Sequence, residues 1–144
     1  MALETIFQFL LAVFLGALIG LEREIKRKEA GLQTYSLVAL GSCLLSAIAF
    51  SLDKIGVISD PSPIFLAIGI GMGFIGAGTI FHRENKIEGL TTAAGLWVTA
   101  MVGVAVGTQL YFLAVFATFL ILLIFAGFGY LEGKIFKSES REIK

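Results

Sequence analysis

Four short groups of polar residues interrupt this largely apolar sequence, and their side chains could bind ions. The carboxylates of Glu22 and Glu24 are candidate ligands for a hydrated cation such as Mg²⁺, because Mg²⁺ prefers oxygen ligands and keeps several of its waters. Helix starts within these groups could offer free N–H groups to an anion. The alternative is that the groups form ion pairs and helix caps at a membrane interface. Their members are Glu22, Arg23 and Glu24; Gln33 and Thr34; His82 and Arg83; and Glu88, Thr91 and Thr92.

Covalent catalysis is not expected from these residue types. The chain has one histidine, His82, next to Arg83, and one cysteine, Cys43, in an apolar stretch. They cannot supply a Ser/His/Asp or Cys/His arrangement, and no second histidine could share a metal with His82. The formal net charge of zero argues against a nucleic-acid partner, because binding a phosphate backbone needs a basic surplus. We therefore expect neither an enzyme nor a cofactor.

The elements that must position the polar groups are transmembrane helices. Hydrophobic residues make up 57% of the 144 residues and charged residues 15%. Three uncharged intervals of about 17, 23 and 22 residues are each close to the length that crosses a membrane as a helix. A fourth, of roughly 43 residues, is long enough to cross twice, with a turn at Gly107-Thr108-Gln109. The sequence predicts an all-α bundle of five transmembrane helices, at about 5–21, 32–52, 64–81, 90–106 and 110–131.

The distribution of basic residues predicts the orientation of this bundle. With the N-terminus outside, the first loop, a short polar connection over 82–88 and the C-terminal end lie in the cytoplasm, and they carry every lysine and arginine except Lys54. Cytoplasmic loops are enriched in these residues. We therefore expect a cytoplasmic C-terminus, a transmembrane domain over 1–133 and a polar tail over 134–144. In this orientation all four polar groups lie on the cytoplasmic face and form one cluster.

Glycines crowd the third predicted helix. Gly71, Gly73 and Gly76 spell the G-x-G-x-x-G pattern of a dinucleotide-binding turn. That turn needs a soluble βαβ unit and an acidic residue about 20 positions further on, and this sequence has neither. In a helix, Gly69, Gly73 and Gly76 share one face, while Gly71 and Gly78 share another. Two glycine faces predict two close helix neighbours.

Small residues recur at helical spacing in other predicted helices. Gly16 and Gly20 in the first helix, and Gly95 and Gly103 in the fourth, predict further close contacts. Five helices do not obviously need this many small-residue faces. A contact with a second copy of the chain, as a C2 homodimer, is therefore a further hypothesis.

The sequence contains, in order, the strings GALIGLERE at 16–24, AGLQT at 30–34, LVALGS at 37–42, the glycine stretch at 69–78, GLTTAA at 89–94 and LWVTA at 96–100. Together these strings resemble the N-terminal membrane domain of the MgtC/SapB family of bacterial membrane proteins, over about residues 10–107. The resemblance implies an integral inner-membrane protein associated with growth at low Mg²⁺, intracellular survival of pathogens and, in some members, restraint of the F-type ATP synthase. It does not establish transport.

Two features depart from the family pattern. The family commonly has arginine where Gln33 stands, so a charged contact expected at this position is missing. Many members also continue into a soluble C-terminal domain, whereas this sequence ends at Lys144. We therefore do not expect a regulatory role that belongs to such a domain.

Together with the residue types above, the resemblance implies a non-enzymatic modulator of magnesium or membrane-energy homeostasis in the bacterial inner membrane. It would act within the lipid bilayer through contacts with membrane proteins such as the ATP synthase. The alternative is a channel or transporter for Mg²⁺ or another ion, with a path along the third and fourth helices that opens at the cytoplasmic cluster. A transporter that moves ions through a relay of carboxylates usually has Asp or Glu inside a transmembrane helix. In this sequence every acidic residue lies at or beyond the end of a predicted helix, which argues against such a relay.

Overall fold

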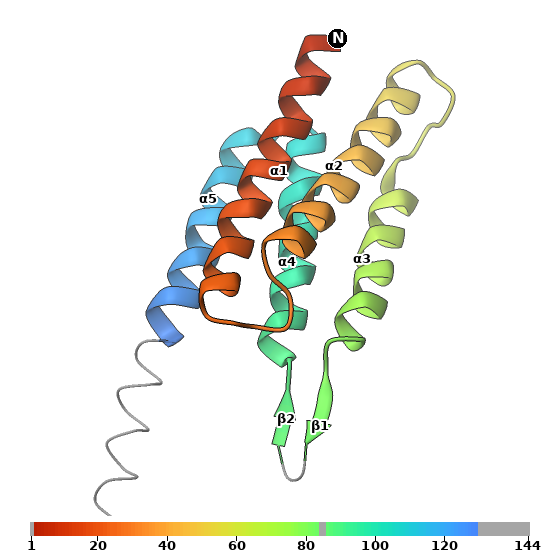
Figure 1. Ribbon diagram of the computed structural model, residues 1–144. Helices are drawn as coiled ribbons and strands as arrows, with labels where there is room; N and C mark the ends of the chain where they lie inside the picture. The colour runs from red at the N-terminus through yellow and green to blue at the C-terminus, as the bar shows by residue number, and fades with distance from the viewer. Residues whose placement is uncertain (1, 84–85, 130–144) are drawn as a thin grey trace, which may run out of the picture.

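The computed structural model describes residues 2–83 and 86–129, and five α-helices make up most of this part of the chain (Figure 1). The predicted all-α bundle is confirmed. The ends of α1 and α3 and the starts of α2 and α4 lie at the same end of the bundle. The predicted tail at 134–144 lies outside the described residues. The helices are α1 Ala2–Ile25, α2 Leu32–Lys54, α3 Ser62–Ala77, α4 Leu90–Gly107 and α5 Tyr111–Leu123, which continues into a π-helix, η1, at Ile124–Phe128.

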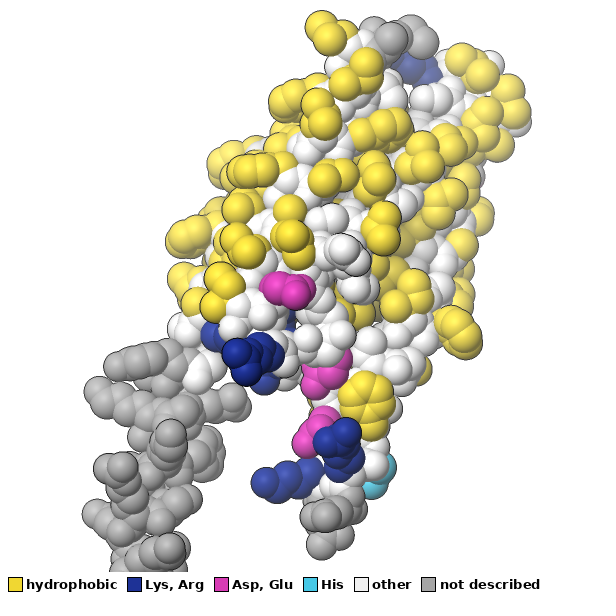
Figure 2. All heavy atoms as spheres, in the orientation of Figure 1, with side chains coloured by type: hydrophobic (Ala, Val, Ile, Leu, Met, Phe, Trp, Pro, Cys, Tyr) yellow, Lys and Arg dark blue, Asp and Glu magenta, His cyan; other side chains and the backbone are white. Residues whose placement is uncertain are grey.

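Four helical segments are long and apolar enough to cross a membrane, namely α1, α2, α4 and α5 together with η1. α3 is shorter, with 16 residues. At about 1.5 Å per residue it extends roughly 24 Å, less than the ~30 Å hydrocarbon core. Hydrophobic side chains cover most of the face of the bundle seen in Figure 2, while most charged side chains gather near its lower end. This distribution is typical of a membrane protein.

α3 ends earlier than predicted, at Ala77 instead of near Phe81. Beyond it, the backbone N–H groups of Thr79 and Ile80 donate to carbonyls three residues earlier, at 3.0 and 3.2 Å. Such tight bonds are common where a helix ends. Thr79 Oγ1 also donates to Gly76 O at 2.8 Å. A threonine that we assigned to the apolar span thus helps to terminate the helix.

A β-hairpin joins α3 to α4 and projects from the bundle (Figure 1). Its strands are β1 Phe81–Arg83 and β2 Lys86–Glu88. They pair antiparallel, with Arg83 opposite Lys86, and their residues are exposed. We predicted only a polar connection here, because strands of three residues are too short to show an alternating pattern.

Gly89 connects the hairpin to α4 with a φ of 88°, a conformation that favours glycine. A Cβ atom at this position would also overlap the carbonyl group of Thr79. We expect Gly89→Ala to lower the free energy of unfolding by about 1–3 kcal/mol, since backbone strain and the overlap both act on the folded state. Unfolding in SDS, followed by circular dichroism, measures the change. Gly41→Ala is the matched control, because a Cβ at Gly41 meets nothing within 4 Å; equal losses in both variants would contradict the prediction.

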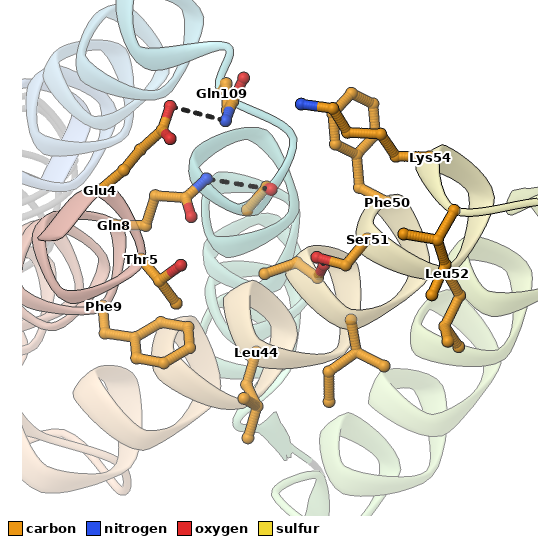
Figure 3. Close-up of a pocket in the computed structure, with 14 residues that line it drawn as sticks. Glu4, Thr5, Gln8, Phe9, Leu44, Phe50, Ser51, Leu52, Lys54 and Gln109 are labelled. Atoms are coloured by element: carbon orange, nitrogen blue, oxygen red, sulfur yellow. Dashed lines mark hydrogen bonds between the residues drawn. The ribbon is translucent and has the colours of Figure 1, made fainter. Parts of the chain in front are cut away.

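The turn between α4 and α5 lies where the sequence predicts it, and α1 holds it in place (Figure 3). The buried side chain of Gln8 donates through Nε2 to Val106 O and Gly107 O, both at 3.2 Å. Carbonyls at a helix end lack part of their intrahelical partners, so a side-chain donor stabilises them. Gln109, with a φ of 67°, donates through Nε2 to Glu4 Oε1 at 2.9 Å. The start of α1 is thereby attached to the turn.

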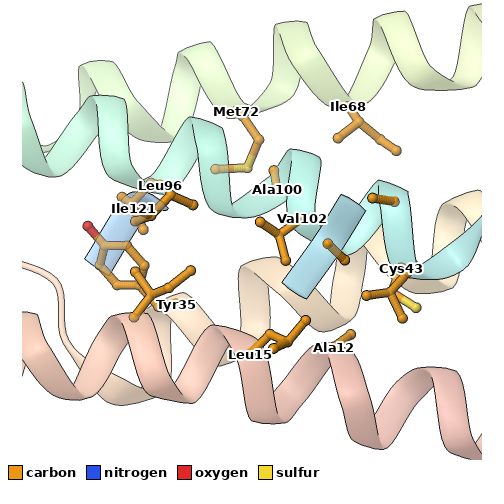
Figure 4. Packing of buried hydrophobic residues seen from close by; sticks show 14 of the residues in the cluster. Ala12, Leu15, Tyr35, Cys43, Ile68, Met72, Leu96, Ala100, Val102 and Ile121 are labelled. Carbon is orange, nitrogen blue, oxygen red and sulfur yellow. The ribbon is translucent and has the colours of Figure 1, made fainter. Parts of the chain in front are cut away.

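The core lies where α2 packs against both α1 and α4 (Figure 4). A Cβ at Gly16 of α1 would come 2.7 Å from Tyr35 O and 2.8 Å from Ala39 Cβ. A Cβ at Gly103 of α4 would overlap the Ala39 carbonyl from the other side. Gly20 similarly faces Leu32 Cα, at 2.8 Å. Glycine therefore lets the backbones approach on both sides of α2. The buried apolar residues include Ala12, Leu15, Tyr35, Cys43, Ile68, Met72, Leu96, Ala100, Val102 and Ile121.

Within the described chain, the glycine-rich stretch of α3 packs closely against one neighbour and not against two. α3 packs mainly against α4, through Ile68, Met72 and Gly76, which are spaced four residues apart on one face. A Cβ at Gly76 would come 3.4 Å from Ala93 Cβ, while at Gly78 only carbonyls of α3 itself lie nearby. In α3, a Cβ atom would meet no described atom within 4 Å at three glycines, Gly69, Gly71 and Gly73.

Candidate functional site

Side chains from several elements meet at the end of the bundle from which the hairpin projects. They come from the last turns of α1, from the loop that follows it, from the starts of α2 and α4, and from η1. We call this set the charged-end network. It consists of Glu22, Arg23, Lys26, Glu29, Tyr35, Thr92 and Phe125.

Arg23 is the buried cation of the charged-end network, with only 3% of its surface exposed. Its Cζ lies 4.2 Å from the centroid of the Phe125 ring, an arrangement in which the face of the ring attracts the guanidinium. Its Nη1 lies 3.4 Å from Glu22 Oε2. Arg23 Nε is buried and has no hydrogen-bond partner within residues 2–83 and 86–129. One carboxylate and one aromatic ring therefore hold this charge.

Lys26 links α1 to η1. Its Nζ lies 2.6 Å from Glu22 Oε1, one helical turn earlier, and donates to Phe125 O at 2.5 Å. Glu22 therefore faces two cations, one through each carboxylate oxygen. Short π-helical segments such as η1 often occur at functional sites, and here the segment presents both a ring and a carbonyl to α1.

Gly95 of α4 makes room for the network. A Cβ there would come 2.5 Å from Phe125 Cζ and 2.7 Å from Tyr35 Oη. Tyr35 is fully buried, and its hydroxyl donates to Thr92 O at 3.4 Å. A glycine that we predicted for helix packing thus admits two aromatic side chains of the site.

Two carboxylates near the first loop bind the starts of α2 and α4. Glu24 Oε2 accepts a hydrogen bond from the backbone N–H of Leu32, the first residue of α2, at 3.1 Å. A carboxylate is favourable at this position because helix starts carry free N–H groups and a partial positive charge. Glu29 Oε2 accepts a hydrogen bond from Thr92 Oγ1 at 2.6 Å. This bond is the main cause that lowers the pKa of the Glu29 carboxyl below its ordinary value of 4.5.

Thr92→Val should raise the pKa of Glu29 towards 4.5, because valine keeps the shape of threonine but cannot donate the hydrogen bond. Since the folded state lowers this pKa, the contact stabilises the protein above the ordinary pKa and is lost as the pH falls through the folded value. Titration of ¹³C-labelled glutamate side chains by NMR measures the change. Thr91→Val, at the exposed neighbouring position, is the control. An unchanged Glu29 titration in Thr92→Val would show that the hydrogen bond does not set the pKa.

The structure brings together only part of the predicted cytoplasmic cluster. Glu22, Arg23 and Thr92 belong to the charged-end network, and Glu24 lies beside it at the start of α2. The remaining members lie apart from these contacts. Gln33 and Thr34 are in the first turn of α2, Thr91 is exposed at the start of α4, and His82, Arg83 and Glu88 are on the exposed hairpin.

The carboxylates of Glu22 and Glu24, the candidate ligands for a hydrated cation, make different contacts in the structure. The carboxylate of Glu22 faces Arg23 and Lys26, whereas that of Glu24 caps α2. In the described parts of the chain, no three His, Cys, Asp or Glu side chains come together as metal ligands. A magnesium ion at Glu22 would have to displace two cations from an acid that the chain already neutralises.

Four members of the charged-end network were not among the predicted site residues, namely Lys26, Glu29, Tyr35 and Phe125. Lys26 stands four residues after Glu22, a spacing that indicates an ion pair on one helix face and could have identified it. Glu29 lies in a charged loop, where sequence alone does not select its partner. Phe125 is one of 13 phenylalanines, and nothing in its sequence context distinguishes it from those that face lipid.

Comparisons with known proteins agree with the resemblance. A sequence model of the MgtC family matches residues 9–134. The chain is 39% identical over 142 residues to "Putative magnesium transporter YhiD" of Escherichia coli (strain K12), covering 94% of this chain and 65% of that protein. It is 41% identical over 119 residues to Protein MgtC of Salmonella typhimurium (strain LT2), covering 81% and 49% of the two chains. It is also 41% identical over 120 residues to Protein SapB of Bacillus subtilis (strain 168), covering 79% and 51%. The chain thus spans about half to two thirds of the length of these relatives. No solved structure matches it.

Proposed function

The chain belongs to the MgtC family, and from this premise we propose that it is a non-enzymatic protein of the inner membrane that modulates magnesium or membrane-energy homeostasis through contacts with other membrane proteins. The name of its relative YhiD, which refers to magnesium transport, supports the link to magnesium. The observation that favours a modulator over a transporter is that the chain itself neutralises the carboxylate of Glu22. Both of its oxygens face cations of the chain itself, Arg23 and Lys26.

The buried hydroxyl groups inside the helices support the same choice. Ser46, Thr99 and Thr118 each donate to a carbonyl four residues earlier in their own helix, at 2.7 to 2.8 Å. Ion pathways through membranes are lined by polar or charged groups that face the ion. The protons of these three hydroxyls are thus bonded within their own helices, as expected of hydroxyls that serve helix packing.

We propose the orientation that the basic residues predict, with the charged-end network in the cytoplasm and the N-terminus outside. Arg23 and Lys26 of the network, and Arg83 and Lys86 of the hairpin, lie at the same end of the bundle. Cytoplasmic ends are enriched in such residues. Labelling of single cysteines in intact cells by an impermeant maleimide tests it: a cysteine at Gly56 should react from outside and one at Lys86 should not.

Magnesium flux into sealed liposomes tests the modulator function. Vesicles that contain the purified chain and a Mg²⁺-sensitive dye should show the same Mg²⁺ entry as empty vesicles, since a modulator that acts through contacts with other proteins carries no ion itself. A Mg²⁺ ionophore added at the end confirms that the dye responds. Entry well above that of empty vesicles would overturn the proposal.

The second candidate function is a Mg²⁺ transporter, which the name of YhiD favours. In that case the ion would have to exchange with Arg23 and Lys26 at Glu22. Glu22→Gln should then abolish the flux, and Lys86→Gln, a neutralised charge on the hairpin, should leave it unchanged. Equal Mg²⁺ flux in the wild type, in Glu22→Gln and in Lys86→Gln would argue against a path through the charged-end network.

We further propose two contacts for this protein, one with the F-type ATP synthase and one with a second copy of the chain. The open glycines of α3 support the second contact, because Gly69 and Gly73 lie on one face of the helix, which another helix could approach closely. Purification from native membranes in lipid nanodiscs, followed by mass measurement, tests both. We expect the mass of a dimer and co-purified ATP synthase subunits. A monomer without either would contradict both contacts.

A further inference from the structure

A cavity of about 520 Å³ opens at the end of the bundle opposite the hairpin (Figure 3). It lies between the first turns of α1, the last turns of α2 and the turn that joins α4 to α5. Glu4, Gln109 and Lys54 lie at one end of the cavity in the view of Figure 3, Phe9 and Leu44 lie at the other, and Thr5, Gln8 and Ser51 lie between them. The cavity therefore has a polar mouth and an apolar floor.

The mouth presents one negative and one positive side chain. Glu4 of α1 uses Oε1 to accept a hydrogen bond from Gln109, which fixes the position of the carboxylate. Lys54, the last residue of α2, is exposed, and its Nζ makes neither a hydrogen bond nor an ion pair with any residue within 2–83 and 86–129. Figure 3 shows the two charges on opposite sides of the mouth. Both are available to a ligand with complementary charges.

The floor of the cavity is continuous with the outer surface of the bundle. Leu44 and Ile48 of α2 line the cavity, and yet 42% and 45% of their surfaces remain exposed. In a membrane, side chains exposed on the outside of a helix face acyl chains. A ligand that enters from this side can therefore place a hydrocarbon chain on the floor and a polar head at the mouth.

We propose that this cavity binds a phospholipid whose headgroup carries both a phosphate and a primary ammonium. The ammonium donates hydrogen bonds to Glu4, the phosphate accepts them from Lys54, and the upper part of one acyl chain lies along Phe9, Leu44 and Ile48. Charge-assisted hydrogen bonds of both signs select such a zwitterion over a lipid with a single charge. The volume is within the ~300–1,000 Å³ typical of small-ligand sites, so it accommodates the headgroup and the first methylene groups and leaves the rest of the lipid in the bilayer.

Native mass spectrometry of the full chain in detergent, with phospholipids that share the same acyl chains, tests the proposal. Phosphatidylethanolamine should be retained about tenfold better than phosphatidylcholine, whose quaternary ammonium cannot donate to Glu4, and than phosphatidylglycerol, which has no ammonium. This comparison uses the wild-type protein, so it does not depend on the folding of a variant. Equal retention of the three lipids would overturn the proposal.

Two variants assign the headgroup contacts. Glu4→Gln still accepts the hydrogen bond from Gln109 but should abolish the preference for phosphatidylethanolamine over phosphatidylcholine. Lys54→Gln should weaken retention of all three lipids about tenfold, because each contains a phosphate. The matched controls are Asp53→Asn, next to Lys54 but outside the cavity lining, and Lys86→Gln on the hairpin, and both should behave as wild type. A preference that persists in Glu4→Gln and Lys54→Gln would place the lipid elsewhere.

Discussion

Replacing Gly103 by leucine is expected to abolish the folded bundle. A single Cβ atom at this position would already overlap the Ala39 carbonyl and come 3.0 Å from Ser42 Cβ. A backbone carbonyl cannot rotate away as the end of a side chain can, so α2 and α4 would have to separate. Because α2 also packs against α1 through Gly16, the separation would disturb both interfaces. We expect a loss of more than about 3 kcal/mol in the free energy of unfolding.

Gly71→Leu is the matched control for this prediction. It makes the same chemical change in the middle of α3, where a Cβ would meet no described atom within 4 Å, and the expected loss is below about 1 kcal/mol. Circular dichroism during SDS titration measures both variants. A Gly103→Leu protein as stable as wild type would contradict the close packing of α2 and α4. A large loss in Gly71→Leu would show instead that α3 has a neighbour beyond the described contacts, such as a second copy.

The contrast between Gly103 and Gly71 also shows what helical spacing can predict. Small residues at regular spacing indicate that one face of a helix permits close approach. They do not indicate whether another helix occupies that face. Gly16 and Gly103 meet α2, whereas Gly71 meets nothing in the described chain. The difference depends on the position of each helix in the bundle, and α3 lies at its edge.

The helices themselves could be predicted because they depend on a local property. Crossing a membrane requires about 20 residues without charges, and the gaps between charges, together with the turn at 107–109, located α1, α2, α4 and the start of α5 within a few residues. The end of α3 could not be found in this way. Its terminating contacts involve Thr79 and Ile80, which are uncharged and are compatible with a continuing span.

The candidate site could be predicted as a region but not as a set of contacts. Alternating crossings bring the ends of α1 and η1 to the starts of α2 and α4, so Glu22, Arg23 and Thr92 were predicted to lie near one another. Their partners depend on side-chain geometry. The Phe125 ring can lie against Arg23 because Gly95 has no side chain in its place. These three residues are on different helices, and no local sequence pattern connects them.

Glu22→Gln is expected to destabilise the protein by about 3 kcal/mol, because it removes the carboxylate that neutralises a buried cation. Only 14% of the Glu22 side chain and 4% of the Arg23 side chain are exposed, so water can replace little of the lost interaction. The glutamine amide would also direct a donor group at Lys26 or Arg23, where only an acceptor is favourable. SDS titration measures the loss. Addition of Mg²⁺ should leave the stability of the wild type unchanged, whereas a magnesium site at Glu22 would make it rise with Mg²⁺.

The double variant Glu22→Gln/Arg23→Met separates the loss of a charge partner from a general loss of packing. Methionine can lie on the Phe125 ring without a charge, and replacement of a buried ion pair by apolar groups is often neutral or stabilising. We therefore expect the double variant to regain most of the stability lost in Glu22→Gln, while Lys26, whose side chain is 36% exposed, turns towards water. Glu24→Gln is the control, because its oxygen can still accept the hydrogen bond from Leu32, and it should lose less than about 1 kcal/mol. If the double variant were less stable than Glu22→Gln, the guanidinium of Arg23 itself would be required by the fold, and its role would not be confined to the ion pair.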